Sequence, residues 1–315
     1  MKAVAMHAFG GPEVLVVTDR PRPKPDRGEL LIRTVAAGVN PVDWKIREGL
    51  LRDRIPHVFP LVPGWDLAGT VEEIGDDVTR IRKGERVFAY ARKPVVQWGT
   101  YAELVAVPET SVAPMPSRLL FEEAAAVPLA ALTAYQSLFG RAGIARGNVV
   151  LIHAGAGGVG HFAVQLASNA GARVLATAGA GSQEFLLGLG ASVAIDYTRE
   201  DWSEAVDRYS PEGVDFVFDT IGGETQKLSF DVLKPGGRMV GIVSPPDPTL
   251  ARKRRVDASY VFVEPSASQL ATLGAMCDAG KLKPNVQRIF PLADAAEAQR
   301  VSQAGHVRGK LVLAL

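Results

Sequence analysis

The sequence predicts an α/β protein of two domains, one rich in β-strands and one built on a parallel, doubly wound sheet. Three observations predict this fold class. Residues 1–118 hold short β-patterned runs separated by Gly and Pro, residues 148–243 alternate strand-like and helix-like segments, and the first of those strands ends in a glycine-rich turn. At 315 residues and 33.5 kDa the chain is also long for one hydrophobic core, so two domains are expected.

Composition narrows the function classes. The chain is 47% hydrophobic and 22% charged with a net charge of +1, which is ordinary for a globular protein and argues against a nucleic-acid or anionic-membrane binder. The basic run 252–255 is interpreted as a solvated loop. A single cysteine, Cys277, excludes a disulfide framework and a Cys-rich zinc site. No signal-peptide core or unbroken apolar span is visible, so we expect a cytoplasmic protein.

The first domain is predicted from its turn chemistry. Runs such as ELLIRTVAAGV, LAGTVEEIG and ERVFAY have the β-branched content of strands, and PRPKPDRG and GDDVTRIRKG separate them. Many short strands joined by such turns favour a small barrel-like β domain.

The second domain is predicted from alternation. A helical segment follows Phe121, and after it strand and helix patterns succeed each other in a regular order. We expect strands at 148–154, 173–178, 193–197, 214–220 and 237–243, and helices at 158–170, 182–190, 201–209 and 224–233. This order is typical of βαβ units in a parallel sheet.

The last part of the chain changes pattern again. We expect a strand at 259–263, helices at 268–280 and 293–306, and a closing strand at 310–315. These elements could return to the first domain and make it discontinuous. The expected domains are therefore 1–121 with 266–315, and 122–265.

The glycine turn AGAGGVG, residues 154–160, carries the first functional prediction. Gly155, Gly157 and Gly160 stand in the G-x-G-x-x-G order of a dinucleotide site, between a buried strand and a helix. Glycine permits a sharp turn, close approach of the backbone to a pyrophosphate, and tight helix–strand packing. With Gly158 and Val159, the start of the helix offers free N–H groups to an anion.

Motifs along most of the chain resemble one family. They are AAGVNPVDWKIREG at 36–49, PLVPGWDLAGTVEEIG at 60–75, TAYQSL at 133–138, the glycine turn, GVDFVFDTIGG at 213–223, LKPGGRMVGI at 233–242 and HVRGKLVL at 306–313. Together they resemble the medium-chain dehydrogenase/reductase superfamily, and within it the zinc-independent quinone oxidoreductase branch that includes zeta-crystallin-like reductases. The resemblance implies a GroES-like β-barrel catalytic domain and a Rossmann nucleotide-binding domain.

The resemblance also provides a test for metal. Relatives that oxidise alcohols use a Cys, His and Cys zinc site, and the matching positions here are Asn40, Trp65 and Leu129. The five histidines show no metal-like spacing either, so no metal is expected. Without one, hydride delivery to a conjugated acceptor still works, because the resulting enolate needs only a hydrogen-bond donor and a proton. We therefore predict NADPH-dependent reduction of a quinone or an α,β-unsaturated carbonyl compound.

The resemblance implies a catalytic set in the NPVDWK segment. Asn40 would face the substrate carbonyl or the nicotinamide ribose, and Asp43 would act beside it or pair with a neighbour. Relatives often have a tyrosine where this chain has Lys45, and this lysine would either donate to the developing oxyanion or lie at the surface. Burial would lower the pKa of Lys45 and ease proton transfer. A set of four aromatic side chains would wall the pocket of a flat substrate, with core packing as the alternative: Trp44, Trp65, Tyr90 and Trp98.

The residues at the end of the second strand of the nucleotide-binding domain determine the preference between NAD and NADP. The acid that would hold the ribose of NAD is missing, because Thr177 and Ala178 stand there, and the basic residue expected for NADP is missing too. Ser182, Tyr197 and Arg199 remain as phosphate or adenine contacts, so NADPH is favoured with NADH as the alternative. By resemblance, further cofactor contacts come from Thr133, Ile242, Val243, Phe262, Val263 and Lys310.

Two other function classes stay open. One is a non-catalytic nucleotide-binding protein, either a redox sensor or a structural protein, and the other is a zinc alcohol dehydrogenase. The expected partner is a small-molecule substrate. The strand 259–263 is where relatives pair two subunits, so a homodimer is expected.

Overall fold

The computed structural model describes all residues from Met1 to Leu315, and they form two compact units. Unit 1 comprises Met1–Leu132 and Pro265–Leu315, and unit 2 comprises Thr133–Glu264. The first boundary falls after Leu132 and not after residue 121 as expected. The reason is α2 (Phe121–Ala125), which packs on strands β3 and β5 of unit 1 and buries Ala124 and Ala125 there.

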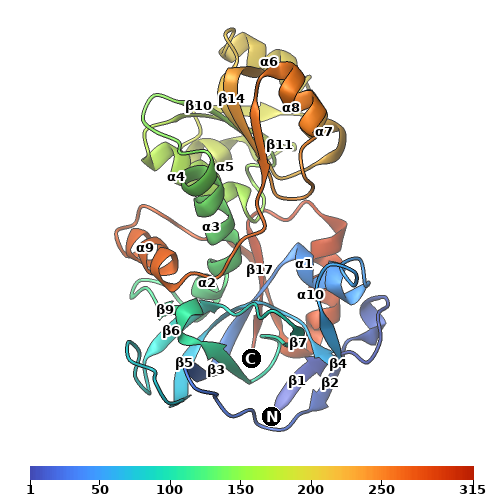
Figure 1. Cartoon of the computed structure of the whole chain (residues 1–315), viewed down its shortest axis with the longest axis vertical. Helices are drawn as coiled ribbons and strands as arrows, with labels where there is room; N and C mark the ends of the chain where they lie inside the picture. Colours follow the sequence, from blue (N-terminus) through green and yellow to red (C-terminus); the bar gives the residue numbers. More distant parts are fainter. The chain divides into compact units, whose positions relative to one another are not determined.

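Unit 1 is built on a seven-stranded sheet (Figure 1). Its order is β16-β17-β3-β5-β6-β9, with β8 also paired to β3. The strands are β3 (Glu29–Val39), β5 (Asp66–Ile74), β6 (Arg86–Tyr90), β8 (Leu104–Pro108), β9 (Val112–Pro114), β16 (Val286–Pro291) and β17 (Lys310–Ala314). Two small sheets accompany it, formed by β1 (Lys2–Ala5) with β2 (Val16–Asp19) and by β4 (His57–Val62) with β7 (Val96–Trp98).

The long strand β3 organises this unit. It pairs antiparallel with β5 on one edge and with β17 on the other, where Leu311 lies opposite Val39. The predicted closing strand of the chain therefore returns to the first domain. Leu30, Ile32 and Leu311 are buried in one core, which explains why the last residues of the chain belong with its beginning.

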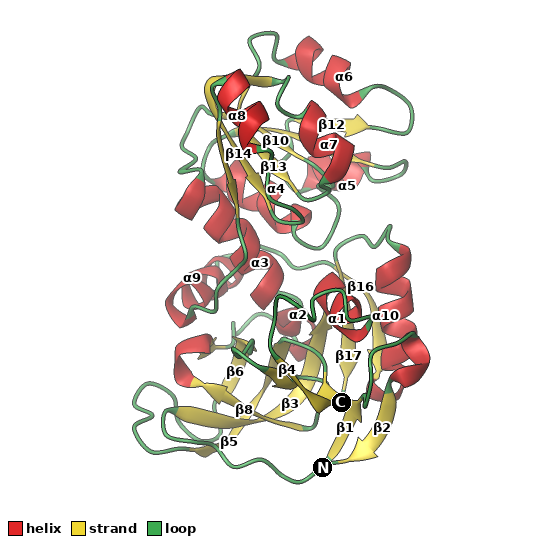
Figure 2. Cartoon of the chain, turned by 45° about the vertical axis from the view of Figure 1, so that its right-hand side comes forward, coloured by secondary structure: helices red, strands yellow, loops and turns green.

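The helices of unit 1 lie around these sheets (Figure 2). They are α1 (Pro41–Arg47), α2, α9 (Ala267–Asp278), α10 (Ala295–Ala304) and the short 3₁₀ turns at Pro12–Val14, Glu109–Ser111 and Leu292–Asp294. Helix α3 (Pro128–Tyr135) contains the boundary between the units, and a π-helical turn, Gln136–Arg141, follows it. Helix α1, which we did not predict, starts at Pro41, because a proline at the first helical position loses no hydrogen bond.

Unit 2 contains a six-stranded parallel sheet in the order β12-β11-β10-β13-β14-β15, with helices around it (Figure 2). The strands are β10 (Val149–Ile152), β11 (Arg173–Ala178), β12 (Val193–Asp196), β13 (Val214–Asp219), β14 (Leu233–Gly241) and β15 (Asp257–Tyr260). The helices are α4 (Gly160–Asn169), α5 (Gln183–Gly188), α6 (Trp202–Tyr209), α7 (Gly223–Leu228) and α8 (Pro248–Arg254). This is the strand order of a doubly wound dinucleotide fold, so the predicted fold class is confirmed.

Two local expectations for unit 2 were wrong. The basic run 252–255 was interpreted as a loop, but Arg252, Lys253 and Arg254 form the last turn of α8. Positive side chains at a helix C-terminus are stabilised by the helix dipole, which explains the composition of the run. The strand expected at 259–263 ends at Tyr260, although the N–H of Val261 still donates to the Gly241 carbonyl of β14. No helix in the chain combines the length and the apolar character needed to cross a membrane.

Candidate active site

The glycine turn between β10 and α4 has the geometry of a phosphate cradle. A β-carbon added at Gly160 would lie 2.1 Å from the carbonyl oxygen of Ala154 and 2.8 Å from the α-carbon of Gly155. Both neighbours are backbone atoms, which cannot rotate away. Only glycine therefore allows the first residue of α4 to close on the turn.

The open side of this turn presents hydrogen-bond donors. The N–H groups of Gly158, Val159 and Gly160 have no partner within the chain, because they precede the first helical hydrogen bonds of α4. The first bonds after them are donated by His161 to Gly157 and by Ala163 to Val159. The positive end of the α4 dipole adds to these donors, so the turn fits the pyrophosphate of a dinucleotide.

The left-handed residue of the turn is Ala154, with φ +47°, and not one of the glycines. Gly155 serves packing, because an added β-carbon would lie 2.9 Å from side-chain carbons of both Ala176 and Leu186. Gly157 meets only the Ala154 carbonyl oxygen, at 3.2 Å from an added β-carbon. Gly157 therefore has the open surroundings expected where a ligand approaches the backbone.

Thr177 holds this turn from the neighbouring strand. Its hydroxyl accepts a hydrogen bond from the Ala154 N–H at 3.2 Å, and its carbonyl accepts one from Gly155 at 2.8 Å. The side chain is 3% exposed. We expected Thr177 to contact the cofactor, and the structure instead directs its hydroxyl under the turn.

Most predicted cofactor residues gather at one edge of the sheet of unit 2. The glycine turn, Ser182, Tyr197, Ile242, Val243, Phe262 and Val263 all follow the carboxyl ends of parallel strands. Ligands of doubly wound sheets bind along this edge, where the strand order reverses between β10 and β13. Two predicted cofactor residues lie elsewhere, since Thr133 is buried in α3 and Lys310 is buried in unit 1.

The residues predicted to read the adenosine end lie after β11 and β12. A β-carbon built on Gly179 would lie 3.4 Å from the Tyr197 hydroxyl oxygen, so the two loops approach each other closely. Tyr197 is 47% exposed, and Arg199 is exposed with its guanidinium 3.7 Å from the Asp196 carboxylate. Both side chains are therefore accessible to a ligand, and Ser182 precedes α5 beside them.

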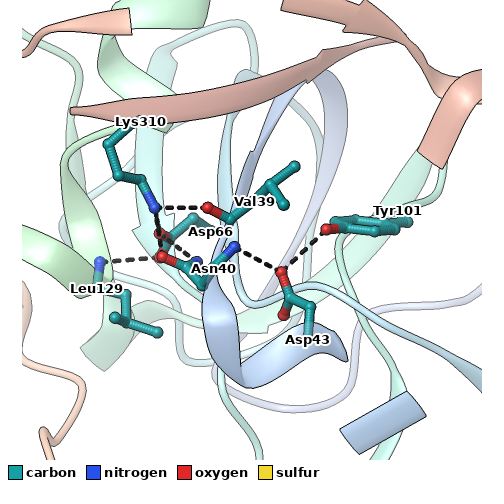
Figure 3. A network of polar contacts seen from close by, with 7 residues as sticks. All are labelled: Val39, Asn40, Asp43, Asp66, Tyr101, Leu129 and Lys310. Atoms are coloured by element: carbon teal, nitrogen blue, oxygen red, sulfur yellow. Dashed lines mark hydrogen bonds and ion pairs between the residues drawn. The ribbon is translucent and has the colours of Figure 1, made fainter. Parts of the chain in front are cut away.

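In unit 1, a buried polar network surrounds the Asp66 carboxylate (Figure 3). Asp66 accepts hydrogen bonds from the Asn40 amide and from the Leu129 N–H, each at 2.9 Å, and the Lys310 ammonium lies 4.0 Å away. Lys310 in turn donates to the main-chain carbonyl of Val39 at 2.8 Å and to the side-chain amide oxygen of Asn40. Burial raises the pKa of Asp66 to about 6 and lowers the pKa of Lys310, because both charged forms lose water.

A second carboxylate continues this network through α1. One oxygen of Asp43 accepts hydrogen bonds from the Asn40 N–H at 2.8 Å and the Tyr101 hydroxyl at 2.9 Å. The first of these bonds caps α1. The other oxygen has no partner, and burial raises the pKa of Asp43 to about 7. Asp43 therefore has the structural role that we considered beside the catalytic one.

Two expected roles need correction. Asn40 was expected to face the substrate or the ribose, but its amide bridges Asp66 and Lys310 and is 1% exposed. Lys310 was expected to approach the cofactor, but its ammonium is held within the core of unit 1. Both departures have one cause, because a buried carboxylate at position 66 needs donors and a counter-charge.

Lys45 keeps the properties expected of a proton donor. It is half-buried on α1, its ammonium lies 5.6 Å from the ring centroid of Trp44, and burial lowers its pKa. The expected aromatic wall is not a single surface. Trp65 and Tyr90 pack edge to face in the core with centroids 6.1 Å apart, whereas Trp98 is 44% exposed beneath the guanidinium of Arg20.

Comparison with known proteins fits this architecture. A family model of the alcohol dehydrogenase GroES-like domain matches residues 26–117, and one described as zinc-binding dehydrogenase matches residues 189–313. An NADPH-dependent alkenal/one oxidoreductase of Arabidopsis thaliana is 35% identical over 99% of this chain and 79% of the relative. The chain belongs to the medium-chain dehydrogenase/reductase superfamily.

Solved structures place it further within this superfamily. The Escherichia coli quinone oxidoreductase complexed with NADPH is 28% identical, with a TM-score of 0.88 and 100% of both chains covered. An NAD-dependent alcohol dehydrogenase is 34% identical, with a TM-score of 0.92 and 100% of both chains covered. Because its relatives include quinone and alkenal/one oxidoreductases and its zinc-ligand positions hold Asn40, Trp65 and Leu129, the chain belongs to the zinc-independent quinone oxidoreductase branch.

The positions of the zinc ligands in this superfamily have other uses here. Asn40 and the backbone of Leu129 both donate to Asp66, and Trp65 packs on Tyr90. No group of three or more His, Cys, Asp or Glu side chains is placed to hold a metal ion.

Sequence reasoning missed two residues that organise the sites, namely Asp66 and His153. Asp66 lies in the motif PGWDLAG, where we considered only the neighbouring tryptophan. His153 lies directly before the glycine turn, and the residues that it contacts are far away in the sequence.

Proposed function

We propose that this protein is an NADPH-dependent oxidoreductase that reduces quinones or α,β-unsaturated carbonyl compounds. The glycine turn carries the proposal, because it combines free N–H donors with a cradle that an added β-carbon would fill. The alkenal/one and quinone oxidoreductases that resemble the chain support both the cofactor and the substrate class.

The turn would hold the pyrophosphate through the N–H groups of residues 158–160. Tyr197 and Arg199 would contact the adenosine phosphate, since both are exposed beside the loop after β11. An aspartate in that loop would repel the phosphate, and none is present. Because an exposed contact is screened by water, we expect a moderate preference for NADPH over NADH.

Bound NADPH supplies a hydride, and the acceptor then needs a hydrogen-bond donor and a proton. Lys45 is the best donor in unit 1, because Asn40 and Lys310 are committed to Asp66. Burial lowers the pKa of Lys45, so its proton is transferred more easily than that of a solvated lysine. The half-buried ring of Trp44 beside it would contact a flat acceptor.

The test is turnover across a panel of quinones, enals and enones with NADPH and with NADH. We expect NADPH oxidation with at least one acceptor class. Cofactor binding without turnover on any acceptor would favour the sensor alternative, and absence of binding of either cofactor would exclude the proposal.

Alcohol oxidation is the second candidate, because an NAD-dependent alcohol dehydrogenase is among the similar structures. Asn40, Trp65 and Leu129 argue against it, since none of these side chains replaces a thiolate or imidazole ligand of zinc. Stoichiometric zinc in the purified protein, together with NAD-dependent alcohol oxidation, would support this candidate instead.

We further propose a homodimer formed through the edge of unit 2. Strand β15 ends the parallel sheet and has a partner on one side only. An unpaired strand edge can pair with its symmetry mate around a two-fold axis. Light scattering during size-exclusion chromatography should give twice the chain mass of 33.5 kDa, and a mass of one chain would refute the proposal.

A further inference from the structure

A buried chain of hydrogen bonds runs beneath the glycine turn of unit 2. The Ala154 N–H donates to the Thr177 hydroxyl at 3.2 Å, and that hydroxyl lies 3.2 Å from His153 Nδ1. His153 Nε2 lies 2.9 Å from the Ser229 hydroxyl, which donates to the Thr225 carbonyl at 2.6 Å. These hydrogen bonds thus connect the turn after β10 with β11 and with α7.

The number of available protons fixes which group donates in each of these hydrogen bonds. Ser229 has a single hydroxyl proton, which it donates to the Thr225 carbonyl, so its oxygen must accept a hydrogen bond from His153 Nε2. A neutral imidazole protonated on Nε2 has an acceptor at Nδ1. Thr177 then donates to Nδ1 and accepts from Ala154, and every donor among these four residues has an acceptor.

The surroundings keep His153 neutral. His153 is 1% exposed, Thr177 3% and Ser229 0%, and the Trp202 ring packs edge-on with its centroid 4.6 Å from that of the imidazole. Burial lowers the pKa of His153 to about 4 although Asp219 opposes the shift. A second ring proton, on Nδ1, would have to be accepted by the Thr177 hydroxyl, and the hydroxyl's own proton would then lose the imidazole as its acceptor.

Ala154, whose N–H donates to Thr177, also has a strained backbone. Its φ is +47°, a region that residues other than glycine rarely adopt. Its N–H is held by Thr177, its carbonyl accepts from Gly157 at 2.9 Å, and the preceding carbonyl, of His153, accepts from the Thr220 hydroxyl at 2.7 Å. The conformation of Ala154 sets the direction of the turn that follows it.

We propose that neutral His153, protonated on Nε2, is a positioning residue that holds Ala154 through Thr177 and so aims the N–H groups of residues 158–160 at the cofactor pyrophosphate. This inference rests on the proposed function, because it assigns a role in cofactor binding. His153 acts through Thr177 and does not touch the ligand.

The tautomer is tested first, in the protein without cofactor. Nitrogen-15 NMR of the imidazoles at neutral pH should show His153 protonated on Nε2 alone, and His153→Gln identifies its signals. A ring protonated on Nδ1, or on both nitrogens, would overturn the proposal. This measurement does not depend on the protein's activity.

Cofactor binding is tested with isosteric variants. Thr177→Val removes one hydroxyl and leaves the Ala154 N–H without its partner, so the Kd for NADPH should rise about tenfold. The kcat at saturating NADPH should stay within about twofold, because the acceptor site is unaffected, and Thr177→Ser should restore the affinity. Thr34→Val is the matched control, since Thr34 is buried in unit 1 with a hydroxyl that has no partner.

A second variant protects the test against a folding failure. Ser229→Ala removes the acceptor for Nε2 and should weaken NADPH binding in the same direction. Wild-type affinity in both Thr177→Val and Ser229→Ala would overturn the proposal. Failure of the wild-type protein to bind NADPH would instead refute the proposed function, and the two failures are therefore distinguishable.

Discussion

Replacing Gly160 with alanine tests the cradle most directly. The added β-carbon would lie 2.1 Å from the Ala154 carbonyl oxygen, whereas ordinary contact begins at about 3.4 Å, so the turn must open by roughly 1 Å. Overpacking of this kind costs about 1–3 kcal/mol. If opening the turn to remove this clash moves the free N–H groups away from the pyrophosphate, NADPH binding loses the same amount of free energy. The Kd for NADPH should then rise by about 10- to 100-fold.

The assay is fluorescence titration of purified Gly160→Ala with NADPH, with thermal unfolding measured in parallel. Gly188→Ala is the control, because Gly188 ends α5 and an added β-carbon there meets nothing within 4 Å. This control should bind NADPH like the wild type and should be stabilised by a few tenths to about 1 kcal/mol. An unchanged Kd in Gly160→Ala would refute the assignment of the turn as the pyrophosphate site.

Three further predictions concern unit 1. Lys310→Met leaves the Asp66 carboxylate buried without its counter-charge, so it should lower the free energy of unfolding by about 3–5 kcal/mol in denaturant titration. The loss should be much smaller in the double variant that also carries Asp66→Asn. Equal losses in the single and double variants would contradict this account of the pair. The folded-state pKa of Asp43 is raised from 3.8 to about 7, so its contribution to stability is fully present below pH 3.8 and is lost as the pH rises to 7. The stability of Asp43→Asn relative to the wild type should therefore increase over this range, and a constant difference would show that Asp43 titrates normally. Lys45→Met should lower turnover and leave the Kd for NADPH unchanged, and unaltered turnover would remove Lys45 from the mechanism.

The sheet of unit 2 was predictable because its determinants are local. Each strand is a short apolar run, each helix follows within a few residues, and the glycine turn joins the first such pair. The glycine spacing predicted the tight turn between β10 and α4 for the same reason. The left-handed residue could not be identified in this way, because Ala154 is not a glycine and the partner of its N–H, Thr177, comes from the next strand.

The polar network of unit 1 was not predictable, because its members are distant in the sequence. Asn40, Asp66 and Lys310 meet only after β3 has paired with both β5 and β17. The family resemblance named two of these residues and gave them roles toward the ligand. It could not show that a buried carboxylate consumes their hydrogen-bonding capacity.

The roles of Asn40 and Leu129 now have a common explanation. Zinc-dependent relatives use the matching positions as metal ligands, and the resemblance alone indicated only that those ligands are absent. In this chain both positions donate to Asp66, one through a side-chain amide and one through the N–H that begins α3. Lys310 completes the arrangement as a cation inside the same unit. A buried carboxylate is thus stabilised by two neutral donors and one ammonium, and a cysteine at position 40 would remain a neutral thiol, because burial and the nearby carboxylate both raise the pKa of a thiol. Asn40→Cys removes the amide that contacts Asp66 and Lys310, so it should lower the free energy of unfolding in denaturant titration and should not bind zinc.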